Sequence, residues 1–211
     1  MESRIFYIAV LTVLALWGPT SSIAASYCGA LTSSYGPFDY RKKSEYPEQI
    51  YLVESAHFTP EVENLIKGNT GQIGADLGYT LAVFPNHLRA LTSVAKLALR
   101  SKLPKDGAMR YSFNCYFERA MRFTPNDDGV YAVYGTFLYK KGDVAGAIKQ
   151  FERAIEIKDD NATANYNLGL IYVQKKQYDE ALKYAKKAYA LDYPVPGLKS
   201  ALVAAGKWDT P

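Results

Sequence analysis

Two cysteines and two histidines are the side chains in this sequence best suited to nucleophilic or metal chemistry. They are Cys28, Cys115, His57 and His87. Neither histidine has a spacing partner that would complete a metal site, and we interpret both as ordinary residues at helix starts. A nucleophilic cysteine would need a base, to which nothing in the sequence points. Because phosphate loops, nucleophile elbows and paired-histidine zinc motifs are also missing, we predict no catalytic residues, no cofactor and no metal.

The first residues have the pattern of a secretory signal peptide, which we place at residues 1–24. Arg4 precedes an apolar run from Ile5 to Trp17, and Ser22 to Ala24 offers small residues for a signal peptidase. The apolar run is too short to span a membrane comfortably, so we expect a periplasmic or secreted protein with no integral span after cleavage. A lipid anchor on Cys28 is the less favoured alternative, because the residue before it is not small.

Export changes the interpretation of the two cysteines. In an oxidising compartment an even pair favours a disulfide between Cys28 and Cys115. The bond would tie the mature N-terminus to the helical body, and closing so long a loop contributes roughly 4 kcal/mol in the chain-entropy model. Two unpaired thiols are the alternative.

The formal net charge of +4 is too small to indicate a nucleic-acid partner.

A unit of 34 residues occurs twice in succession and organises the rest of the chain. One copy starts at Asp128 and the next at Ala162. The copies share small residues at their eighth, twentieth and twenty-seventh places, and apolar residues recur between these at helical steps. The small residues are Gly135 and Gly169, Ala147 and Ala181, and Ala154 and Ala188. Each copy therefore predicts two amphipathic helices that pack antiparallel, with the small residues where backbones approach closely.

These residues and this period resemble the tetratricopeptide repeat family. The resemblance implies an all-α, right-handed superhelical stack of helix hairpins whose first helices line a concave groove for a protein segment. The implied groove positions are Ala132, Thr136, Tyr139, Lys140, Tyr166, Asn167, Leu170, Val173 and Gln174. Some family members clamp a terminal carboxylate with lysines and asparagines, but here Lys140 alone supplies a nearby positive charge.

The predicted order of segments follows from this repeat. Residues 128–161 and 162–195 are the two clear repeats, and residues 59–127 form divergent hairpins. The first divergent hairpin pairs a helix from Glu61 to Lys67 with one from Ile73 to Phe84. The second pairs His87 to Arg100 with Met109 to Phe123, across an enlarged polar turn. Residues 196–211 form a capping helix and a tail, in which Trp208 folds back on the cap.

Residues 25–58 are expected to form an extended, aromatic N-terminal arm. Gly36-Pro37 interrupts any helix there, although Gln49 to Val53 could add a short turn or helix. Tyr35, Phe38 and Tyr40 are either a contact patch for a partner or a sugar, or the anchors that pack the arm on the helices, and we favour packing. The sequence leaves open whether the arm fills the groove.

Three further segments of the sequence resemble an uncharacterised group of exported bacterial tetratricopeptide-repeat proteins. These segments are Tyr35 to Arg41, Ala56 to Val62 and Leu191 to Gly206. The resulting hypothesis is a non-enzymatic scaffold or assembly factor of the cell envelope that binds a protein or peptide in its groove. The alternatives are a self-associating structural subunit and, less favoured, a glycan-binding protein that uses the aromatic patch.

Overall fold

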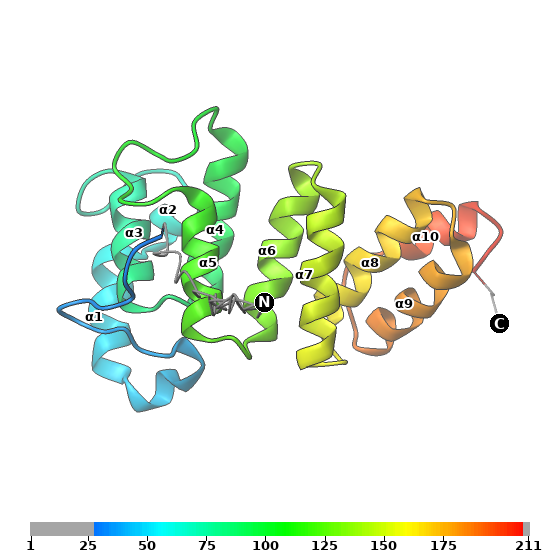
Figure 1. Cartoon of the computed structure of the whole chain (residues 1–211), viewed down its shortest axis with the longest axis horizontal. Coiled ribbons are helices and arrows are strands. Elements are labelled where there is room, and N and C mark those ends of the chain that lie inside the picture. Colours follow the sequence, from blue (N-terminus) through cyan, green and yellow to red (C-terminus); the bar gives the residue numbers. More distant parts are fainter. Residues whose placement is uncertain (1–27, 209–211) are drawn as a thin grey trace, which may run out of the picture.

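The structure, a computed structural model, describes residues 28–208. Over this range the regular secondary structure is helical, and neighbouring helices pack in pairs that follow one another along the long axis of the molecule (Figure 1). The predicted all-α stack of helix hairpins is therefore confirmed. The predicted signal peptide, residues 1–24, lies outside the described residues.

The helices vary in length, and the longest are the four helices of the two repeats and the helix over Leu88–Arg100. In chain order they are η1 (Tyr40–Glu45), α1 (Pro47–His57), α2 (Pro60–Glu63), α3 (Ile73–Val83), α4 (Leu88–Arg100), α5 (Phe113–Phe123), α6 (Asp128–Lys140), α7 (Val144–Ile157), α8 (Ala162–Gln174), α9 (Tyr178–Ala190) and α10 (Gly197–Ala204).

The two repeats fold into the hairpins α6–α7 and α8–α9, as the 34-residue period predicts. Gly135 lies where a Cβ would come within 2.7 Å of the ring of Phe151 on α7, so only a glycine leaves room for that fully buried ring. Gly169 instead faces Leu198 of α10, the helix that follows its hairpin. Gly142 turns the first hairpin with a positive φ of 86°, whereas Lys176 takes the corresponding place in the second with a φ of 59°.

The N-terminal hairpins depart from the expected pairing. Helix α3 packs as closely on α1 as on α4, and the predicted helix from Glu61 to Lys67 is wrong beyond Glu63. Helix α2 stops there because Leu65 adopts a left-handed φ of 58° and the Asn64 side chain donates to the Pro60 carbonyl. The segment between α1 and α3 is thus a connection with one helical turn.

The predicted helix from Met109 to Phe123 begins only at Phe113. The backbone N–H of Met109 donates to the carbonyl of Asp106, and that of Phe113 donates to the carbonyl of Pro104. The enlarged turn therefore satisfies its own polar groups, while the buried Met109 side chain packs into the core beneath it.

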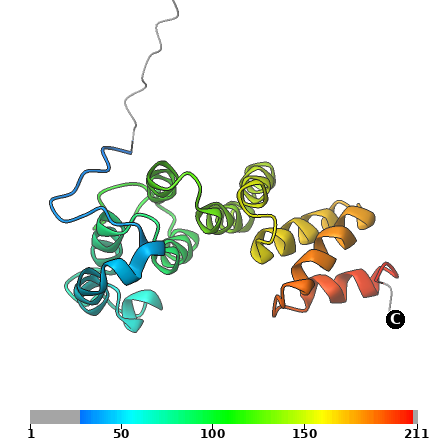
Figure 2. The ribbon, with the colours of Figure 1, turned by 90° about the horizontal axis from the view of Figure 1, so that it is seen from below.

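The segment assigned to an extended arm is extended only as far as Asp39. Helices η1 and α1 occupy most of the remainder, and α1 is longer than the short turn or helix expected over Gln49 to Val53. Pro47 in the first turn of α1 and Glu48 beside it suit a helix N-terminus. Figure 2 shows the arm looping around the outside of the N-terminal helices before it enters η1.

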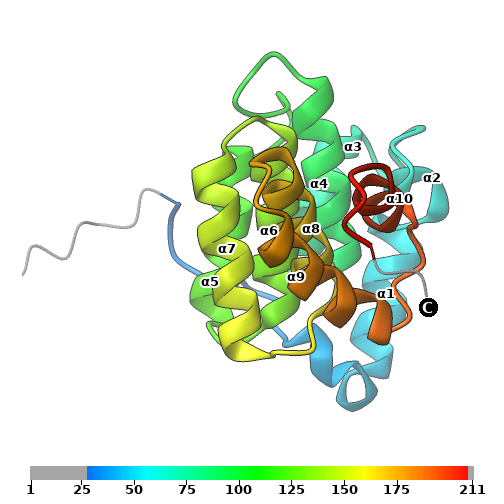
Figure 3. The ribbon, with the colours of Figure 1, turned by 90° about the vertical axis from the view of Figure 1, so that its right-hand side faces the viewer.

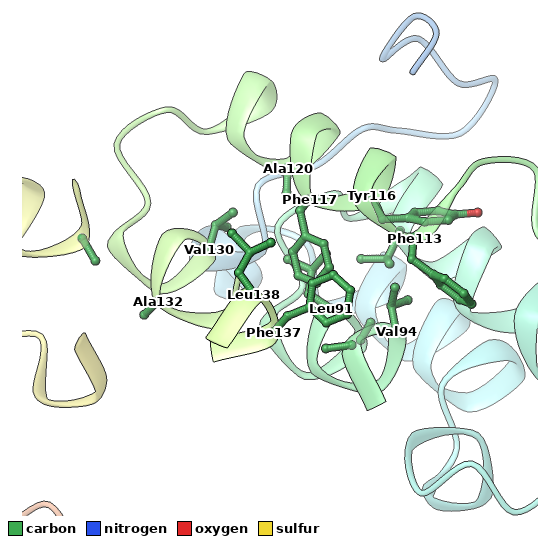
Figure 4. Close-up of a cluster of buried hydrophobic side chains, with 14 of the residues drawn as sticks. Leu91, Val94, Phe113, Tyr116, Phe117, Ala120, Val130, Ala132, Phe137 and Leu138 are labelled. Carbon is green, nitrogen blue, oxygen red and sulfur yellow. The ribbon is translucent and has the colours of Figure 1, made fainter. Parts of the chain in front are cut away.

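A continuous hydrophobic core runs from α2 to α8 and positions the first helices of successive hairpins. In its centre the stacked rings of Phe117 and Phe137 join α5 to α6, with centroids 5.3 Å apart (Figure 4). A second cluster joins α8, α9 and α10 around Leu198 and Leu202. Both leucines are fully buried, and their helix α10 covers the C-terminal end of the stack (Figure 3). Trp208 folds back on the cap as predicted, because Nζ of Lys199 on α10 lies 5.2 Å from its ring centre. Its ring also meets that of Tyr189 on α9 edge to face at 5.7 Å.

Candidate groove between helices α4, α6 and α8

The first helices of three successive hairpins line a hollow of about 260 Å³. Its floor is mostly apolar, and two lysines stand at its rim. The lining residues are Thr92, Ala95, Lys96 and Leu99 from α4, Val133, Thr136, Phe137 and Lys140 from α6, and Thr163 from α8. Lys96 and Lys140 are exposed, and the lining contains no carboxylate. This surface can therefore accept an apolar side chain and a neighbouring negative charge.

The predicted groove residues are distributed between this hollow and the core. Thr136 and Lys140 line the hollow. Ala132 is buried, and the same is true of Tyr166 and Asn167 on α8. The remaining four lie at or near the surface, where Tyr139, Leu170 and Val173 are half-buried and Gln174 is exposed.

Tyr166 is covered because the chain after α9 folds over it. The ring of Tyr193 stacks on that of Tyr166 with a centroid distance of 4.4 Å, and only 6% of Tyr166 remains exposed. Asn167 donates its side-chain amide to the Thr163 carbonyl within its own helix at 2.8 Å. Neither side chain is presented to a ligand, and the amide of Asn167 is not free to clamp a carboxylate.

Helix α4 supplies the part of the hollow that the sequence analysis missed. Thr92, Ala95, Lys96 and Leu99 stand three and four residues apart on α4, the spacing that places side chains on one helix face. The groove positions of the clear repeats could have been transferred to α4 because it is also the first helix of its hairpin. The enlarged turn after α4 breaks the 34-residue period and conceals this correspondence.

His87 has the role expected of a residue at a helix start. Its Nδ1 accepts the Ala90 backbone N–H at 3.1 Å, so the ring proton is on Nε2, which donates to Glu54 Oε1 at 3.0 Å. The Tyr40 hydroxyl donates to the same carboxylate oxygen at 2.7 Å. The bond from His87 lowers the pKa of Glu54 to about 2, and burial raises the pKa of Tyr40 to about 12. The cluster of Tyr40, Glu54 and His87 thus joins η1 to α1 and to the start of α4.

His57 is not at a helix start, contrary to the prediction, because it is the last residue of α1. Its Nδ1 lies 2.9 Å from Asp76 Oδ1, and the Thr70 hydroxyl donates to the same oxygen. The backbone N–H groups of Asn69 and Thr70 donate to Asp76 Oδ2. In an acyl-transfer triad the hydroxyl would donate to the imidazole nitrogen remote from the carboxylate. The arrangement instead fastens the connection before α3, and the bonds from these donors lower the pKa of Asp76 against the opposing effect of burial.

The three aromatic residues of the proposed patch pack against the helices. Tyr35, Phe38 and Tyr40 contact a small core cluster formed by Val53, Val83 and Phe84. The ring of Phe38 lies 5.8 Å from that of Phe84, and Tyr40 lies 3.9 Å from the imidazole of His87. All three rings are at least half-covered by the protein itself.

Cys28 and Cys115 form a disulfide, which confirms the predicted pairing. Glu118 lies beside the two sulfurs, but those sulfurs are committed to each other and not to a metal ion. The bond is compatible with an extracytoplasmic protein. Across residues 28–208, none of the helices has the length and apolar character needed to cross a membrane.

Comparison with known proteins places the repeats in a family. A TPR repeat model matches residues 135–176, and a tetratricopeptide repeat model matches residues 162–193. Protein O-mannosyl-transferase TMTC3 from Homo sapiens is 27% identical over 107 residues, which are 50% of this chain and 11% of that protein. Protein CTR9 homolog from Arabidopsis thaliana is 32% identical over 81 residues, 36% of this chain and 7% of that protein. The matched region is thus a small part of either relative.

Proposed function

Because residues 135–193 are tetratricopeptide repeats, we propose that this chain is a non-enzymatic scaffold that binds a protein segment in the hollow between α4, α6 and α8. The observation that carries this proposal is the hollow itself, which three successive first helices line together. Repeat stacks offer such extended concave surfaces to their partners.

The lining indicates the kind of segment that fits. Leu99, Val133 and Phe137 provide apolar surface, while Lys96 and Lys140 place two positive charges at the rim. A volume of about 260 Å³ suits one or two side chains. We therefore expect a segment that inserts an apolar side chain and presents an aspartate, a glutamate or a terminal carboxylate to the lysines.

The proposed place of action is the cell envelope or the exterior of the cell. The Cys28–Cys115 disulfide supports this, because structural disulfides persist in oxidising compartments. There the chain would hold or help assemble an envelope component through the segment that it binds.

Selection of peptides from a random library, followed by titration in fluorescence anisotropy, tests the proposal. We expect the selected peptides to combine an apolar residue with an acidic one. The double substitution Lys96→Glu, Lys140→Glu should weaken their binding about tenfold at low salt, since exposed ion pairs are worth up to about 1 kcal/mol each. The control is Lys149→Glu on the exposed side of α7, which should bind as the unchanged protein does.

Two results would contradict the proposal. Peptides whose binding survives the double substitution would place the binding surface outside the hollow. A sedimentation experiment that shows mass rising with concentration, together with no selected peptide, would favour the self-associating structural subunit instead.

A further inference from the structure

A second hollow lies beneath the N-terminal arm and shares no residue with the groove. Its volume is about 440 Å³, within the range typical of small-molecule sites. The arm covers it with Thr32, Ser33 and Ser34, and helix α3 contributes Ala75, Gly78, Tyr79 and Ala82. Ala108, Arg110, Tyr111, Tyr116 and Arg119 complete the wall. The lining thus combines two guanidinium groups with several hydroxyl groups and contains no carboxylate.

Arg119 is the unusual residue of this hollow, because only 3% of it is exposed and it has no ion pair with a carboxylate of residues 28–208. Its guanidinium donates to the backbone carbonyls of Cys28 and Ala30 and lies 4.5 Å from the ring centre of Tyr111. These partners are neutral. A buried cation without a counter-charge is costly, so the site is electrostatically suited to an anion.

The surroundings of Arg119 add to the uncompensated positive charge of the hollow. Burial lowers its pKa, and the nearby charges of Arg122 and Arg110 lower it further, although a guanidinium stays protonated. Arg122 already pairs with Glu118, whereas Arg110 is exposed at the mouth of the hollow and stacks on Tyr111 at 5.3 Å. An anion in the hollow would lie between Arg110 and Arg119.

The fold keeps this space open by three means. The disulfide anchors the arm at Cys28, and Arg122 also donates to the carbonyl of Gly29 at 2.7 Å. Gly78 lies where a Cβ would come within 3.0 Å of the Tyr116 hydroxyl, so a larger side chain on α3 would intrude on the wall. The lining is therefore held by a covalent bond, a charged hydrogen bond and a small residue.

We propose that this hollow binds a small carboxylate that also carries hydroxyl groups, in the manner of a uronic acid sugar. The guanidinium groups of Arg110 and Arg119 would receive the carboxylate, since their forked donors match its two oxygens. The hydroxyls of Ser33, Ser34 and Tyr116 would face the hydroxyls of the ligand. The same chemistry is presented by a free sugar acid and by the end of an acidic polysaccharide.

Isothermal titration with defined probes tests the proposal. Sodium glucuronate should bind saturably in the micromolar to millimolar range, whereas glucose should not bind. Arg110→Gln should weaken glucuronate binding about tenfold or more, as expected for loss of a charged hydrogen bond, without changing the midpoint of thermal unfolding. Arg100→Gln, an exposed arginine at the end of α4, is the matched control. Short oligomers of galacturonate distinguish the two sources, because only a polysaccharide ligand would bind more tightly as the oligomer lengthens.

Arg119→Gln should abolish binding, but it also removes the donor that holds the arm, so its thermal midpoint must be measured beside its affinity. Arg110→Gln keeps the test decisive, because Arg110 is exposed and its substitution should change ligand binding without unfolding the protein. No saturable glucuronate binding at tens of millimolar would overturn the proposal. Equal binding of inorganic phosphate and glucuronate would overturn the assignment to a sugar acid.

Discussion

Removal of the Cys28–Cys115 disulfide should weaken one half of the molecule and spare the other. The bond joins residues 87 apart in sequence, so breaking it frees a loop that contains α1, α2, α3 and α4. In the chain-entropy model a loop of this length contributes about 4.6 kcal/mol at room temperature. Because whole domains are typically stable by about 5–15 kcal/mol, the loss would be a large fraction of the stability of the N-terminal helices.

The location of the loss follows from the architecture. In a repeat stack each hairpin contacts only its neighbours, so a local change is felt locally. Helices α8 and α9 lie outside the closed loop and pack on α7 and α10. We therefore expect the substitution pair Cys28→Ala, Cys115→Ala to destabilise α1 to α5 and to leave α8 and α9 nearly unchanged.

Hydrogen exchange followed by mass spectrometry measures each half separately. Amides of α3 and α4 that exchange through unfolding of the N-terminal half should exchange up to about two-thousandfold faster, the factor that about 4.6 kcal/mol implies. Amides of α9 should keep their rates. The unchanged protein in the presence of a reductant is the control, and it should reproduce the pattern of the double variant.

Either of two results would refute this reasoning. Equal exchange of α3 and α4 with and without the bond would mean that the non-covalent contacts of the arm, such as those of Arg119 with Cys28 and Ala30, suffice to hold it. Faster exchange spread evenly from α1 to α9 would mean that the stack unfolds as one unit.

Three further predictions concern packing and charge. Gly135→Ala should lower the urea midpoint, because crowding Phe151 costs about 1–3 kcal/mol and the gain in helix propensity is about 1 kcal/mol; a higher midpoint would contradict the close approach. Glu54 has a folded pKa of about 2 against an ordinary value of 4.5, so its contribution to stability is present above pH 4.5 and lost as the pH falls towards 2. Urea titrations should therefore show that Glu54→Gln loses less stability than the unchanged protein between pH 5 and pH 2. An identical dependence of the unfolding free energy on pH would contradict the hydrogen bond from His87 to Glu54. Tyr193→Ala should speed exchange of α10 amides by removing the ring stacked on Tyr166, a pair worth about 0.5–1.5 kcal/mol, and unchanged exchange would mean that Leu198 and Leu202 alone hold the cap.

The clear repeats could be predicted from sequence because their signals are local and periodic. Gly135, Ala147 and Ala154 recur at the offset of 34 residues, and the turn at Gly142 needs the left-handed conformation that glycine favours. The disulfide could be predicted as well, because the expectation of export favours a disulfide and two cysteines allow only one intramolecular pairing.

The N-terminal hairpin could not be predicted in the same way. Thr59-Pro60 is a good local start signal, and a helix does begin at Pro60, but Leu65 ends it within two turns. Helix α1 packs on both α3 and η1, and hydrogen bonds that hold α1 in place connect distant residues. His87 and Glu54 are 33 residues apart, and His57 and Asp76 are 19 apart. Their proximity depends on the fold and not on any spacing in the sequence.

The candidate groove was only partly predictable because its limits are set by the ends of the stack. At the C-terminal end α10 and Tyr193 cover Tyr166, so a position that resembles a groove residue becomes part of the core. At the N-terminal end the disulfide holds the arm over α3 and α5, and none of the arm residues from Cys28 onward lines the hollow between α4, α6 and α8. The arm therefore leaves that hollow open and encloses a separate one. Because the chain itself covers Tyr166, a segment bound in the hollow between α4, α6 and α8 would meet the charges of Lys96 and Lys140 and would not reach Tyr166.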